Sequence, residues 1–112
     1  MKFKLTNEEM LALIATILAH NKSLVVTGKE TEDFSNKLYL SILQELVIKM
    51  QMKAFIRKEK YNLQLSPSQA ICFWICFSGW AALHRTTHIG NIIAIMCETI
   101  YNQIICKNFF NM

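Results

Sequence analysis

Residues 70–83, which read AICFWICFSGWAAL, decide the fold of this chain. Apolar side chains point in every direction around the helix that this stretch predicts, and none of them is charged. A strong start signal precedes it: Ser66 is expected to cap the helix, Pro67 to take its first position and Gln69 to complete a capping box. We therefore expect a helix from Pro67 to about Leu83 or Arg85 that has no polar face to turn toward water.

Charge is distributed unevenly along the chain. The last 52 residues carry only Arg85, Lys107 and Glu98, whereas the first 60 carry the other ten basic and seven acidic residues. Because a large apolar surface is unfavourable in water, the C-terminal half must be covered by the rest of the chain, by a second copy, by a protein partner or by lipid. A hydrophobic content of 53% with 18% charged residues argues against a disordered chain.

Two helices are expected in the N-terminal half. Thr6 and Glu9 have the spacing of a capping box, which starts a helix that runs to about His20. A second helix is expected to start after Thr31 as its cap and to end near Lys60. Its apolar face repeats every four residues, at Phe34, Leu38, Ile42, Leu46 and Met50. The sequence leaves open whether residues 24–26 extend the first helix or form part of the loop that follows.

A fourth helix is expected from Ile89 to about Cys106. The link before it is short and contains Thr86 and Thr87, so the last two helices should be antiparallel neighbours. Three glycines and one proline are too few for many tight β-turns. The chain is thus predicted to be all-α, a single helical domain over residues 1–112. Its architecture should be four-helix bundle-like, with an apolar C-terminal helical hairpin.

The large aromatic side chains of the 70–83 stretch predict an association surface, which comprises Phe73, Trp74, Phe77 and Trp80. Left in water, each would forfeit about 1.5–3 kcal/mol of burial free energy. Burial in a homo-oligomer or against a protein partner is the first reading, and coverage by the other three helices is the second. A membrane hairpin is the third, since residues 61–83 carry no charge. Polar residues in this segment and in the fourth helix argue against it.

A basic stripe is predicted on the second helix, where Lys49, Lys53, Arg57 and Lys60 fall within about 80° of one another. Such a stripe could neutralise nucleic-acid phosphates with strong salt dependence, or contact an acidic protein surface. A solvated helix face is the plainer interpretation. No helix-turn-helix spacing accompanies the stripe.

Metal and catalytic motifs are weak in this sequence. His84 and His88 have a chelating spacing of four, but the threonines between them should interrupt the helix. Cys72 and Cys76 have the same spacing without a second cysteine pair to complete a zinc site, and Cys97 and Cys106 should face opposite ways. We expect buried thiols and neither a metal nor a cofactor.

Glu98 is expected to form a structural pair with Arg85 or a histidine, or to lie at an oligomer seam.

The sequence predicts a non-enzymatic protein, because no phosphate loop, nucleophile elbow or paired carboxylates occur. The predicted function is that of a small regulator, inhibitor or structural subunit that forms a homo-oligomer or docks on a larger protein. Nucleic-acid binding and membrane association are the alternatives. The N-terminus lacks the pattern of a secretory signal, so a cytoplasmic location is expected.

Overall fold

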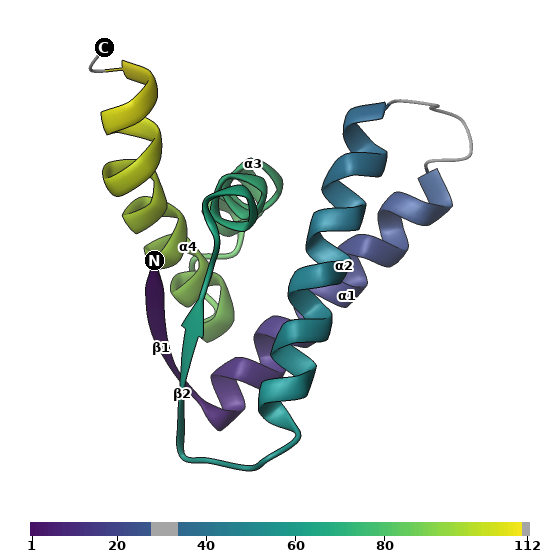
Figure 1. Cartoon of the computed structure of the whole chain (residues 1–112), viewed down its shortest axis with the longest axis vertical. Coiled ribbons are helices and arrows are strands. Elements are labelled where there is room, and N and C mark those ends of the chain that lie inside the picture. The colour runs from purple at the N-terminus through teal and green to yellow at the C-terminus, as the bar shows by residue number, and fades with distance from the viewer. Residues whose placement is uncertain (28–33, 111–112) are drawn as a thin grey trace. The chain divides into compact units, whose positions relative to one another are not determined.

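The structure is a computed structural model that describes residues 1–27 and 34–110, and the side chains of residues 1–23 and 37–106. Within these residues the chain is mostly helical, which confirms the all-α prediction in its coarse form, with a small two-stranded sheet added. The elements, drawn in Figure 1, are β1 (Lys2–Thr6), α1 (Asn7–Thr27), α2 (Phe34–Ala54), β2 (Lys60–Gln64), α3 (Pro67–Leu83), α4 (His88–Ile100) and the π-helix η1 (Tyr101–Phe110). They form two compact units, residues 2–63 and residue 1 with 64–112.

In the first unit α1 and α2 pack side by side (Figure 1). The predicted capping box starts α1: the Thr6 N–H donates to Glu9 Oε1 at 2.8 Å, and the Glu9 N–H donates to Thr6 Oγ1 at 3.2 Å. The helix continues to Thr27, so residues 24–26 belong to it. The predicted cap Thr31 lies outside the described residues. Buried side chains recur at helical spacing on both helices, at Met10, Leu13, Ile14, Ile17, Leu43, Leu46, Val47 and Met50.

The sheet was not predicted, and it corrects the length expected for the second helix. Residue 1 bonds to residue 65 and residue 7 to residue 59, so the strands are antiparallel. Helix α2 ends at Ala54 and not near Lys60, and Lys60 is instead the first residue of β2. Residues 61, 63 and 65 are buried while 60, 62 and 64 are exposed, which is the alternation of a strand with one covered face.

A buried tyrosine holds the connector between α2 and β2. The Tyr61 hydroxyl accepts a hydrogen bond from the Lys58 N–H at 2.9 Å. Its own proton can go to the Ile56 carbonyl at 2.9 Å or to Asn7 Oδ1 at 3.3 Å. One side chain therefore fixes both ends of the segment 56–58.

Replacing this hydroxyl should loosen the connector. We expect Tyr61→Phe to lower the free energy of unfolding by about 1–3 kcal/mol, because it leaves partly buried backbone groups without their partner. Urea unfolding gives the change, and amide exchange at Lys58 should speed up with it. Unchanged exchange at Lys58 would show that the hydroxyl does not hold the connector.

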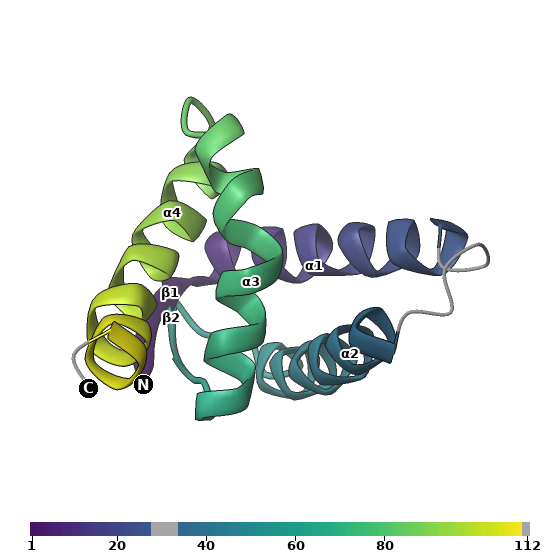
Figure 2. The same cartoon turned by 90° about the horizontal axis from the view of Figure 1, so that it is seen from above.

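The second unit contains a hairpin of α3 and α4 joined by a short turn (Figure 2). The predicted capping box is present: the Gln69 N–H donates to Ser66 Oγ at 3.2 Å and the Ser66 N–H donates to Gln69 Oε1 at 3.0 Å. Thr87 caps α4, as its hydroxyl accepts from the Gly90 N–H at 3.0 Å. The predicted hairpin and the boundaries of α3 are thus confirmed.

The turn between α3 and α4 requires a glycine at position 90, because the backbone of α4 passes very close to the end of α3 there. A Cβ added to Gly90 would lie 1.8 Å from the His84 carbonyl oxygen. The same oxygen accepts hydrogen bonds from the Thr87 N–H at 3.1 Å and from the Thr87 hydroxyl at 2.8 Å. The His84 carbonyl and the Thr87 hydroxyl therefore leave room for only a glycine hydrogen at this position.

Candidate interaction surfaces

Helix α3 does have a solvent face, and that face is apolar. Phe73 and Phe77 lie in the core with no exposed surface, and their rings stack with centroids 5.0 Å apart. On the other side of the helix Ile75 is 43% exposed and Leu83 is 83% exposed, with the exposed Gly79 midway between them. We call Ile75, Gly79 and Leu83 the α3 outer stripe.

Gly79 lies at the centre of the α3 outer stripe with open space beside it. A Cβ built on Gly79 would meet no atom within 4 Å, in contrast to Gly90. A glycine inside a helix is less stable than alanine by roughly 0.5–1 kcal/mol, and no close contact among the described residues requires one here. The α3 outer stripe is therefore a place where another backbone can approach closely.

The two tryptophans of the predicted association surface are partly exposed at the sides of α3. Trp74 stacks on Tyr101 with ring centroids 6.0 Å apart, and Trp80 stacks on His84 at 4.3 Å. Trp80 also meets the buried Phe77 edge-on at 6.3 Å. Of the four predicted residues, the structure thus leaves Trp74 and Trp80 accessible in part and places both phenylalanines in the core. Their role in association stays a prediction.

A groove of about 470 Å³ runs between α3 and α4. Its lining includes small side chains such as Ala81 and Ala94, with Trp74 among the larger ones. Arg85 and Glu98 both line it, which brings the predicted structural pair to one site. Both residues are exposed and, among the residues that the structure describes, no ion pair joins them, so the expected direct pairing is not formed.

The histidines and cysteines of α3 and α4 form no metal cluster of three or more ligands within the described residues. His84 is the C-cap residue that follows α3, and His88 is the first residue of α4, so the predicted interruption separates them. A hydrogen bond between the two thiols, together with burial, raises the pKa of Cys72, while the same bond lowers the pKa of Cys76. Burial raises the pKa of Cys97 to about 12, which keeps that thiol protonated at neutral pH.

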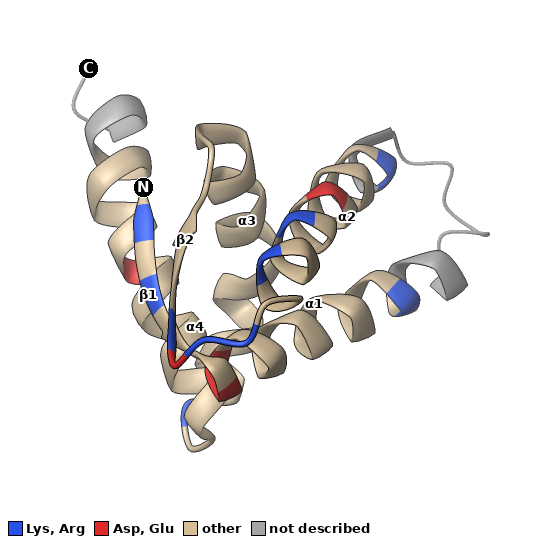
Figure 3. Ribbon diagram, turned by 60° about the horizontal axis from the view of Figure 1, so that its bottom comes forward, with Lys and Arg blue, Asp and Glu red and all other residues tan. Residues whose placement is uncertain are grey.

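The predicted basic stripe does not exist as a helix face. Lys49 and Lys53 are on α2, but Arg57 lies in the connector and Lys60 in β2, because α2 ends at Ala54. The Lys53 ammonium donates to the Asn62 carbonyl and so ties α2 to β2. Figure 3 shows Lys and Arg along β1, on the connector and on the second half of α2.

An exposed apolar group next to these cations was missed from the sequence. Phe55 is 90% exposed and Met52 is 72% exposed, and they border an open hollow of about 360 Å³. With Ile48 and Ile56 they form what we call the apolar tip. The signal was readable in residues 53–60, KAFIRKEK, where two large apolar residues interrupt a basic run.

Among the described residues, only the helical segment His88–Cys106 is long and apolar enough to cross a membrane. Core helices of soluble proteins also meet this criterion of length and composition. Comparisons with family models, with curated proteins and with solved structures found no match to this chain.

Proposed function

We propose that the protein is a non-catalytic interaction protein, a small regulator, inhibitor or structural subunit that associates through the α3 outer stripe. Its partner is a second copy of the chain or a larger protein. The observation that carries the proposal is an exposed helix face with large aliphatic residues at both ends and an open glycine between them. Such a face loses unfavourable contact with water when a second helix covers it.

The spacing within the stripe suits self-association. Ile75 and Leu83 each lie four residues from Gly79, so two α3 helices that cross antiparallel at Gly79 would pair each Ile75 with the other copy's Leu83. The absence of a side chain at Gly79 would let the two backbones approach at the crossing point. A four-helix bundle-like arrangement and a cytoplasmic location remain predictions that accompany this proposal.

A charge placed in the stripe tests the proposal. We expect Ile75→Asp to convert the native assembly into a smaller species, because an interface would have to bury an unpaired carboxylate. Light scattering after size exclusion reports the mass, and circular dichroism should show unchanged helix content, since Ile75 is already exposed.

Ile95→Asp is the matched control for Ile75→Asp. Ile95 is a similarly exposed isoleucine of the same unit, on α4 and outside the stripe. Its replacement should leave the native mass unchanged. An assembly that survives Ile75→Asp with its mass intact would show that α3 does not provide the interface.

A further inference from the structure

The apolar tip lies on the side of α2 opposite its packed face. Ile48, Met52 and Phe55 follow one another at spacings of four and three, which places them on one helical stripe. The buried residues Leu46 and Met50 fall roughly 160–200° away from Ile48 on the same helix. Helix α2 therefore uses one apolar face for the core and presents a second one to solvent.

Backbone hydrogen bonds hold the tip in place. The Phe55 N–H donates to the Gln51 carbonyl at 3.0 Å, which continues the helical turn beyond Ala54. The Ile56 carbonyl is within 2.9 Å of the Tyr61 hydroxyl. The exposed side chains are thus presented by a fixed backbone, so little further ordering is needed when they are buried.

Positive charge surrounds the tip along the chain. Residues 53–60 contain Lys53, Arg57, Lys58 and Lys60 against the single acid Glu59. Glu8 also faces this end, because it lines a hollow of about 450 Å³ together with Arg57, Lys58 and Glu59. The balance stays positive when both acids are counted, which favours an anionic partner.

The shape and chemistry of the tip favour a lipid surface among anionic partners. Exposure rises from Ile48 through Met52 on α2 to Phe55 just beyond its end, so the apolar group projects outward at the end of the helix. A fluid bilayer can receive a projecting apolar group without a preformed pocket, and lysine and arginine side chains beside it can reach the headgroups. Nucleic acid would stack on Phe55 but would leave three aliphatic residues in water.

We propose that the apolar tip and its flanking cations form a peripheral binding site for anionic phospholipid bilayers. The side chains of Phe55 and Ile56 enter the boundary between headgroups and acyl chains. Arg57, Lys58 and Lys60 neutralise the surface charge. The site is separate from the α3 outer stripe, so either surface can be tested without the other.

Co-sedimentation with sucrose-loaded vesicles tests the site. The full chain should pellet with vesicles of phosphatidylcholine mixed with phosphatidylserine and stay in solution with phosphatidylcholine alone. Phe55→Ser should lower the partition constant about tenfold or more, because the variant loses the free energy of burying a large apolar side chain in the bilayer. Each basic residue near an anionic surface contributes about fivefold, so Arg57→Gln with Lys58→Gln should lower it about 25-fold.

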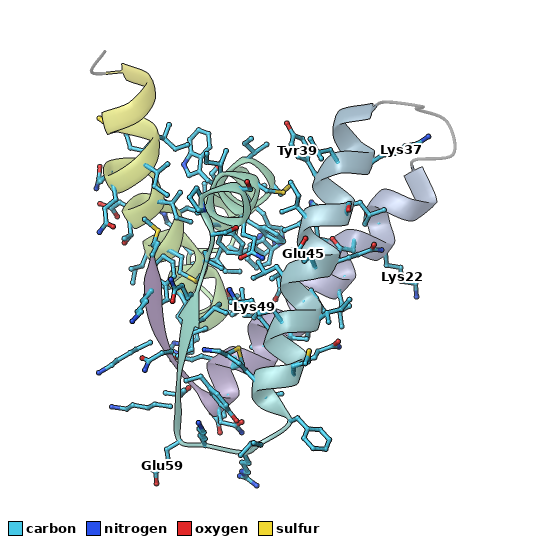
Figure 4. All side chains as sticks on the ribbon, in the orientation of Figure 1. Lys22, Lys37, Tyr39, Glu45, Lys49 and Glu59 are labelled. Carbon is cyan, nitrogen blue, oxygen red and sulfur yellow. The ribbon has the colours of Figure 1, made fainter. Side chains whose placement is uncertain are left out.

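Matched controls come from the same unit. Leu11→Ser removes an exposed apolar side chain from α1, and Lys22→Gln with Lys37→Gln removes two exposed cations. Lys22 and Lys37 lie at the end of the α1–α2 hairpin opposite Glu59 (Figure 4). Both control variants should bind vesicles as the parent does, and circular dichroism should be the same for all variants.

Three outcomes would overturn the proposal. The first is a failure of the parent chain to pellet with anionic vesicles, and the second is equal binding to neutral vesicles. The third is an equal loss of binding in the control variants. A salt-sensitive shift of an oligonucleotide duplex, without vesicle binding, would instead assign the cations to nucleic acid.

Discussion

Gly90→Ala is expected to destabilise the protein by about 3 kcal/mol, near the upper end of typical overpacking costs. The added methyl would lie 1.8 Å from the His84 carbonyl oxygen, which belongs to the backbone and cannot rotate away as a side chain would. Relief of the clash must open the turn and break the bond from the Gly90 N–H to the Thr87 hydroxyl. Thermal unfolding should move down by roughly 12 °C.

The same substitution at Gly79 provides the control and has the opposite sign. Because a Cβ at Gly79 meets nothing within 4 Å, Gly79→Ala should stabilise the folded chain by about 0.5–1 kcal/mol. It should also weaken association if another backbone contacts α3 there. Equal destabilisation by the two substitutions would contradict the different environments of the two glycines.

Phe77→Ala should have the other large effect, a loss of about 3–5 kcal/mol in the free energy of unfolding. The Phe77 ring has no exposed surface, stacks on Phe73 at 5.0 Å and contacts Trp80 edge-on. Removing it leaves a cavity and takes away two aromatic contacts. A loss of this size is a large part of the stability of a typical domain.

Phe55→Ala is the matched control for Phe77→Ala, since the same ring is 90% exposed at the apolar tip. Its removal should change the free energy of unfolding by no more than about 0.5 kcal/mol. Urea denaturation of the two variants measures both values. A cost at Phe77 as small as that at Phe55 would contradict its place in the core.

The sequence predicted the parts of the fold that local signals specify. The capping boxes at Thr6 and Ser66 and the turn before Thr87 each involve residues three apart, and all three are present. The sheet depends instead on pairing residues 2–6 with residues 60–64. No local sequence pattern indicates which distant segment a strand pairs with, although residues 60–65 do alternate between polar and apolar side chains. Missing the sheet also extended the second predicted helix too far.

The candidate surfaces were predicted less well, for a related reason. A helix that is apolar all round has no polar side to mark what faces water, so the sequence predicts a contact surface made of the largest side chains of α3. Phe73 and Phe77 are instead buried, and the smaller Ile75 and Gly79 face outward. Likewise, the basic stripe requires a helix that continues to Lys60, but α2 ends at Ala54. The apolar tip lies among the lysines of this predicted stripe and was therefore missed from the sequence.

The native mass of the unmodified chain, measured by light scattering after size exclusion without detergent, tests the central claim most directly. The chain should run as a dimer or larger assembly over a range of concentrations, because we propose that another copy or a partner covers the α3 outer stripe. A monomer of 13.0 kDa at every concentration, with no protein bound to it, would contradict association through α3.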